Sequence, residues 1–154
     1  MRKYFITFLM ALIIGFFLAN FFINQYNDYE GIKVSGTGEE IYFIQYGVFS
    51  SIESMEDNTI SLQNYVYNIK DDLYYVYVGI TKKEENANKI INYYKSLGYD
   101  AIIKKFEITS EEFLSLLDNY DDVLSNTQDE TAISSVINQV LIKYEEVVIS
   151  GSKN

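Results

Sequence analysis

Carboxylates and tyrosines are the side chains with which this 154-residue chain could carry out chemistry. It contains no His, Cys, Trp or Pro, so the usual zinc ligands and every nucleophile–histidine pair are missing. Four glutamates, Glu53, Glu84, Glu112 and Glu130, each follow a Ser or Thr by three residues. This spacing is typical of a capping box, in which the carboxylate bonds the backbone at a helix start. Since no pair of acids stands out as glycosidase-like, we expect no enzyme, no metal and no cofactor.

Two aromatic segments repeat along the chain. The run from Tyr42 to Val48 (YFIQYGV) is echoed by Tyr74 to Ile80 (YYVYVGI), and the aligned Gly47 and Gly79 are 32 residues apart. Aromatic and β-branched residues at this density predict strands, and the glycines indicate irregularities such as bulges. Each segment is followed by a capping box. After each box, apolar residues recur at the spacing of an amphipathic helix. Each half then closes with a further strand, at about 65–70 and 101–108.

This repeated strand–helix–strand order predicts the fold class. We expect an α+β domain with a ferredoxin-like β-α-β-β-α-β antiparallel sheet, with both helices on one face and the other face open. Two more capping boxes introduce amphipathic helices joined by the short linker 125–129, which predict a C-terminal αα-hairpin. The chain from residue 109 onward has a net charge of −7, whereas residues 82–105 have +3, so we expect the hairpin to pack beside the second half.

The open face of the predicted sheet is where a ligand would bind. Alternate strand residues share a face, and the aligned glycines assign Ile44, Tyr46 and Val48 to the core beneath the helices. Aromatic rings can lie against sugar rings, while Tyr hydroxyls and Gln amides bond sugar hydroxyls and acetamides. The alternatives are cross-strand aromatics that only stabilise the sheet, or a hairpin that covers this face as extra core. The candidate ligand-binding residues are Phe43, Gln45, Tyr75 and Tyr77.

These segments also resemble a known family. Tyr42–Ser50 (YFIQYGVFS), Tyr74–Gly79 (YYVYVG) and the helix end Leu97–Ala101 (LGYDA) are similar to the SPOR domain, and the resemblance covers roughly residues 40–108. It implies a bacterial envelope protein that binds peptidoglycan, typically glycan strands without stem peptides at division or sporulation septa. It also implies the two-half fold described above. The chain departs from the family pattern at two positions, where Tyr75 replaces a common Arg and Ile80 replaces the usual Pro.

An uncharged apolar run, residues 4–23, precedes these segments. Its length of 20 residues, at about 1.5 Å each, would span a hydrocarbon core about 30 Å thick, so we expect one transmembrane signal-anchor helix. Arg2 and Lys3 come directly before the run, and no basic residue follows until Lys33. This bias predicts a single-pass protein of the bacterial cell membrane with a cytoplasmic N-terminus and an extracytoplasmic domain. A cleaved signal peptide is the alternative, although the run is longer than such peptides need and Leu18–Asn20 is a poor cleavage site.

The charge of the chain limits its partners. It is −10 overall, and without Arg2 and Lys3 the exported part has ten basic against 22 acidic residues. Nucleic acid and anionic lipid headgroups are therefore disfavoured as ligands.

Together these features divide the chain into six segments. We expect a cytoplasmic tip (1–3), the transmembrane anchor (4–23), a tether (24–40), the SPOR-like domain (41–108), an acidic helical hairpin (109–148) and a disordered tail (149–154).

Two functions fit these features. The first is a membrane-anchored, extracytoplasmic binding module for peptidoglycan glycan strands in cell division or sporulation. The second is an envelope protein-interaction subunit, in which the sheet domain and the acidic hairpin dock an envelope or divisome protein without binding glycan. Binding to purified sacculi, with and without stem peptides, distinguishes the two hypotheses.

The anchor hypothesis is tested in isolated membranes. Because residues 4–23 carry no charge, we expect the full-length chain to remain in the membrane pellet after a carbonate wash. Protease added to wall-stripped cells should degrade the C-terminal domain. Release of a shortened, soluble form would instead show that a bond near Ala19–Asn20 is cleaved.

Overall fold

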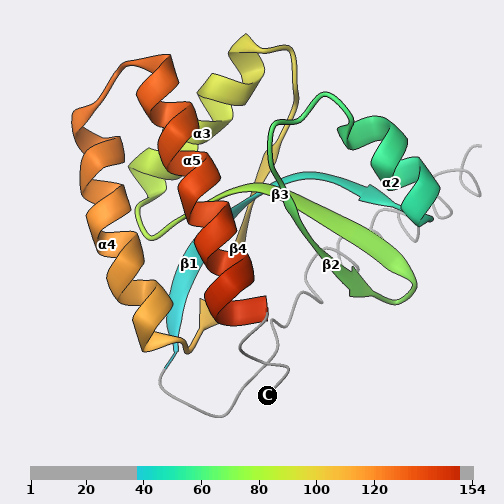
Figure 1. The fold of residues 1–154 in the computed structure, drawn as a ribbon, viewed down its shortest axis with the longest axis horizontal. Helices are drawn as coiled ribbons and strands as arrows, with labels where there is room; N and C mark the ends of the chain where they lie inside the picture. Colours follow the sequence, from blue (N-terminus) through green and yellow to red (C-terminus); the bar gives the residue numbers. More distant parts are fainter. Residues whose placement is uncertain (1–37, 150–154) are drawn as a thin grey trace, which may run out of the picture. The chain divides into compact units, whose positions relative to one another are not determined.

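The computed structural model describes residues 38–149, all of which belong to one compact unit, Val34–Asn154. Within the described range, no helix has the length and apolar character needed to cross a membrane. The predicted cytoplasmic tip, the membrane anchor, most of the tether and residues 150–154 lie outside the described residues. In chain order the elements are β1 (Glu39–Phe49), α2 (Ile52–Thr59), β2 (Val66–Lys70), β3 (Leu73–Thr81), α3 (Glu84–Ser96), β4 (Ile102–Ile108), α4 (Glu111–Asn126), α5 (Glu130–Tyr144) and a π-helical turn, η1 (Glu145–Ile149) (Figure 1).

The four strands form one antiparallel sheet in the order β2-β3-β1-β4. The first and third strands are therefore central, and the predicted ferredoxin-like β-α-β-β-α-β order is confirmed. Asp71 and Asp72 turn β2 into β3 with φ angles of 52° and 60°. Both angles lie in the left-handed region that two-residue hairpin turns require and that Asp tolerates.

Helices α2 and α3 lie on one face of this sheet. Tyr46 of β1 marks the face, because its hydroxyl donates to the carbonyl oxygen of Asn58 in α2 at 3.1 Å. The ring of Tyr46 also contacts Tyr99, just after α3, with 5.8 Å between centroids. Gly79 lets α3 approach the strands closely, since a Cβ there would lie 2.9 Å from Cγ2 of Ile90. The predicted placement of two helices on one face is thus found in the structure.

Helices α4 and α5 form the predicted hairpin and run side by side (Figure 1). Tyr144, the last residue of α5, places its ring 5.4 Å from that of Phe43 in β1. Phe43 alternates with Ile44, which faces α3, so the hairpin covers the opposite face. The prediction of an open face is therefore wrong. Phe43, Tyr77 and Phe106 all project from this face and contact one another. Together they form a large apolar surface of the kind that is usually buried, and the hairpin buries it.

Register shifts in the β1–β3 ladder change which residues share a face. They occur on both sides of Gln45, close to Gly47, where the sequence predicts a bulge. Gln45 pairs with Tyr77, and beyond the second shift Val48 pairs with Tyr75. Val48 therefore lies on the hairpin side of the sheet and is 40% exposed, so its predicted place in the helix-covered core is wrong. An extra residue in a strand reverses the alternation of side chains, which simple parity counting cannot anticipate.

All four helices begin near a predicted capping box, but their caps are other residues. Helix α2 is capped by Ser51, α4 by Ser110 and α5 by Asp129, and each side chain accepts from a backbone N–H three residues later. Helix α3 starts after Lys83, which makes no side-chain cap bond. The Ser/Thr-x-x-Glu spacing thus locates each helix start to within one or two residues but does not identify the capping side chain.

The core beneath α3 provides a stability test. Ile90 is completely buried, whereas Ile60, just after α2, is 87% exposed. Ile90→Ala should lower the free energy of unfolding by about 2–5 kcal/mol, because it empties part of a packed core. Ile60→Ala is the matched control and should change it by less than about 0.5 kcal/mol. Urea unfolding of the full chain measures both, and equal losses in the two variants would contradict the packing of α3.

Candidate functional site

An aromatic cluster fills the space between the sheet and the hairpin. Phe43 has ring-centroid distances of 5.3 Å to Tyr77, 5.0 Å to Phe106 and 5.4 Å to Tyr144. Tyr144 also meets Phe113 of α4 at 5.3 Å. All four contacts are edge-to-face, so that the positive edge of one ring meets the negative face of the next. Burial raises the pKa of Tyr144 above its ordinary value.

Three of the four predicted ligand-binding residues lie beneath the hairpin. Phe43 is 2%, Gln45 6% and Tyr77 5% exposed, and Tyr75 is half-buried. The structure does bring the four residues onto one face of the sheet, as predicted. That face is closed by α4 and α5, so a ligand in solution cannot touch Phe43 or Tyr77 in this arrangement. For these two residues, the alternative in which the hairpin covers the face as extra core describes the structure.

A strip of the same face extends beyond the aromatic cluster. Tyr75 pairs with Val48 on one side and Asn68 on the other, while Gln45 pairs with Ile102 of the edge strand β4. Val48 is 40% and Ile102 48% exposed, and Asn68 is also exposed. We call these five residues the sheet strip. It combines an aromatic ring, two amides and two apolar side chains, which are groups suited to contact with sugars.

Gln45, at the border between the aromatic cluster and the sheet strip, carries a buried acceptor. Its Oε1 has no hydrogen-bond partner among the described residues. Leaving a buried acceptor unpaired destabilises a fold by about 1–3 kcal/mol. The sheet strip therefore contains one polar group whose need for a hydrogen-bond donor is not met by residues 38–149.

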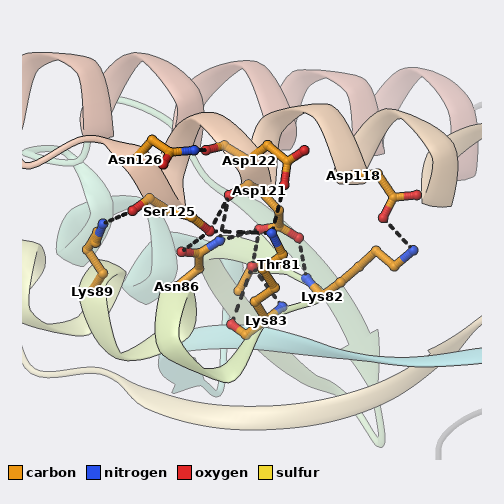
Figure 2. Close-up of polar contacts among 10 residues, drawn as sticks. All are labelled: Thr81, Lys82, Lys83, Asn86, Lys89, Asp118, Asp121, Asp122, Ser125 and Asn126. Atoms are coloured by element: carbon orange, nitrogen blue, oxygen red, sulfur yellow. Dashed lines mark hydrogen bonds and ion pairs between the residues drawn. The ribbon is translucent and has the colours of Figure 1, made fainter.

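A buried carboxylate fastens the hairpin to the sheet domain. Asp121 of α4 is 1% exposed and accepts hydrogen bonds from the hydroxyl of Thr81, from the backbone N–H of Lys82 at 2.8 Å and from Nδ2 of Asn86 at 2.9 Å (Figure 2). These donors belong to the end of β3 and the start of α3. Because Lys83 offers no side-chain cap to α3, the carboxylate from α4 supplies negative charge where the helix dipole favours it. We call Thr81, Asn86 and Asp121 the polar clamp.

Three lysines around the polar clamp add contacts to the hairpin. Nζ of Lys82 lies 2.7 Å from Asp118, and Nζ of Lys83 lies 2.8 Å from Asp122. Burial lowers the pKa of Lys82, but hydrogen bonds to its acidic partners outweigh this effect, and the pKa is raised. Lys89 donates to two carbonyl oxygens at the end of α4, at 2.5 and 2.8 Å. The predicted packing of the acidic hairpin beside the basic second half is thus confirmed.

The role of Asp121 is not predicted from the sequence. In the sequence, Asp121 and Asp122 look like a single solvated acidic pair, but only Asp122 is exposed. The signal that could have revealed the difference is helical spacing, since Leu117, Asp121 and Leu124 follow one another along the buried stripe of α4. Among the described residues, no group of three or more carboxylates is arranged to hold a metal ion.

Comparisons with known proteins find one partial likeness. A scan against protein families gives no match for this chain, and no curated protein matches it. Among solved structures, the solution structure of the peptidoglycan binding domain of the B. subtilis cell wall lytic enzyme CwlC is similar to part of the chain. The two are 27% identical, and the match covers 47% of this chain and 95% of that domain with a TM-score of 0.37. A TM-score this low establishes neither a shared fold nor a shared ligand.

Removing the carboxylate of Asp121 tests the polar clamp. Asp121→Ala leaves the Thr81 hydroxyl, the Lys82 N–H and the Asn86 amide without their acceptor. The free energy of unfolding should fall by about 2–5 kcal/mol, since several buried donors lose their partner together. Asp122→Ala removes an exposed neighbour together with its solvent-exposed ion pair to Lys83, and it should lower the free energy of unfolding by no more than about 1 kcal/mol. Similar midpoints for the two variants would show that the polar clamp does not hold the hairpin.

Proposed function

We propose that this protein is a membrane-anchored, extracytoplasmic module that binds the glycan strands of peptidoglycan without cleaving them, in bacterial cell division or sporulation. The observation that carries the proposal is the position of the segment Tyr42–Phe49. Its sequence resembles the SPOR domain, and it forms most of β1, a central strand in a sheet whose four-strand order is the one that the resemblance implies. Sequence pattern and strand order therefore point to the same class of protein.

The sheet strip has the chemistry that this ligand requires. Glycan strands present hydroxyl and acetamide groups together with the apolar faces of sugar rings. The exposed amide of Asn68 can donate and accept, and the half-buried ring of Tyr75 lies between Val48 and Asn68 in the sheet. All five residues of the sheet strip are uncharged, which suits a ligand bound by hydrogen bonds and ring contacts rather than by ion pairs.

A second candidate is the envelope protein-interaction subunit. The observation that favours it is the hairpin itself, because α4 and α5 remove Phe43 and Tyr77 from the reach of any ligand. The hairpin also presents Val123 and Ile142, which are 50% and 45% exposed, beside acidic side chains. Apolar and charged groups together form the kind of surface that transient protein contacts use.

Sacculus binding by strip variants tests the first candidate against the second. Full-length protein in detergent is mixed with sacculi stripped of stem peptides, and the bound fraction is measured after sedimentation. Asn68→Ala removes an exposed amide of the sheet strip, so binding should fall at nearly unchanged stability. Tyr75→Ala should also weaken binding, with a loss of stability of only about 0.2–1 kcal/mol for a cross-strand contact. Tyr67→Ala is the matched control, since this exposed tyrosine lies on the opposite face of the sheet.

The outcomes separate the two functions. Binding that is lost in the strip variants and kept in Tyr67→Ala supports glycan recognition by the sheet strip. Wild-type protein that ignores stripped sacculi would overturn the glycan proposal and leave the interaction subunit as the function to pursue. Equal binding by all three variants would remove the sheet strip as the site.

A further inference from the structure

A groove runs between α3 and α5, and none of the five sheet-strip residues lines it. It consists of two open cavities of about 520 and 360 Å³ that share Tyr93 of α3 and Glu130 of α5. One wall is a stripe of α3, the other is a stripe of α5, and Gln63 from the α2–β2 connection closes one end. The hairpin that covers the sheet thus also builds one wall of a groove.

Amides and hydroxyls dominate the lining of this groove. Six lining residues are Asn or Gln and four are Ser or Thr, in a chain with 22 acidic residues. Oε1 of Gln63 accepts from Oγ of Ser134 at 3.0 Å and from Nδ2 of Asn138 at 2.8 Å, which fixes the amides at that end. At the other end, the side chains of Asn92 and Gln128 make no hydrogen bond within residues 38–149. Their donors and acceptors are available to a ligand.

The charged groups of the groove argue for an uncharged ligand. Lys89 is the basic lining residue, and its ammonium group is already used by carbonyl oxygens at the end of α4. The two acidic lining residues, Glu85 and Glu130, would repel an anion. A neutral ligand that both donates and accepts hydrogen bonds fits the remaining side chains. The ring of Tyr93, half-buried and shared by both cavities, adds an aromatic surface.

We propose that the groove between α3 and α5 is a second carbohydrate-binding site, which takes a chain of N-acetylated sugars. An acetamide offers one donor and one acceptor, which Asn and Gln side chains complement, and the sugar hydroxyls suit the serines and threonines. The aromatic face of Tyr93 lies against a sugar ring. This inference extends the proposed function, since it assigns the same class of ligand to another surface of the chain.

The test uses a peptide-free and uncharged probe, the tetrasaccharide of N-acetylglucosamine. Full-length protein in detergent is titrated with it by calorimetry, and the melting temperature of each variant is recorded. Asn92→Glu and Ser135→Glu each place a carboxylate on a groove wall, on α3 and α5 respectively. Each should weaken binding by about tenfold or more at unchanged melting temperature, because an anion replaces a ligand contact. Asn119→Glu, an exposed Asn on α4 outside the groove, is the matched control and should bind like wild type.

Sacculus binding measured on the same variants keeps the two proposals separate. Weaker tetrasaccharide binding in both groove variants, with Tyr75→Ala unaffected, supports the groove as a sugar-binding site. This result stands even if wild-type protein does not bind stripped sacculi and the proposed function fails. Absence of tetrasaccharide binding, or equal affinity in Asn92→Glu and Asn119→Glu, overturns the proposal that the groove binds sugars. In that case, sacculus binding that is lost only in the strip variants leaves the proposed function standing.

Discussion

The burial of the aromatic face of the sheet is the constraint on which the rest of the structure depends. Phe43, Tyr77 and Phe106 form one contiguous surface, and the hairpin closes it with eight buried apolar side chains of its own. Burying those side chains removes apolar surface from water and stabilises the closed arrangement. In this arrangement Phe43 and Tyr77 lie beneath the hairpin, so a glycan contact must use surfaces that are already accessible.

The hydrophobic effect depends on how much apolar area is buried and not on the orientation of the groups. It therefore does not by itself fix the position of the hairpin on the sheet. The polar clamp fixes that position, because Asp121 must meet three donors at the junction of β3 and α3 at the same time. If α4 moved along the sheet domain, the carboxylate of Asp121 would lose these three donors. A buried carboxylate without hydrogen-bond partners strongly destabilises a fold. Helix α5 packs against both α4 and α3, and it forms the second wall of the groove.

Some of this arrangement follows from the sequence, and the limits have physical causes. The strands and helices follow from local patterns, namely the aromatic repeat and the helical periods within each segment. The strand order of the sheet follows from the repeated strand–helix–strand order of the two halves. The covered face does not follow, because the periodicity of α4 and α5 shows an apolar stripe without showing what it packs against. The exposed position of Val48 depends on a register shift, and the buried position of Asp121 depends on three tertiary hydrogen bonds. The sheet strip is thus only partly predictable, through Gln45 and Tyr75.

We propose a polymeric, sugar-based ligand for this acidic chain. The net charge of −10 is screened beyond about 8 Å at physiological ionic strength, and it does not repel uncharged sugar rings. Each surface then depends on hydrogen bonds and ring contacts, which contribute about 0.5–1.5 kcal/mol each. We therefore expect a modest affinity at each of the two proposed sites. A glycan strand offers many repeated units. A protein that bound it through both proposed surfaces would gain from the second contact, because that contact forms at the high effective concentration set by the first.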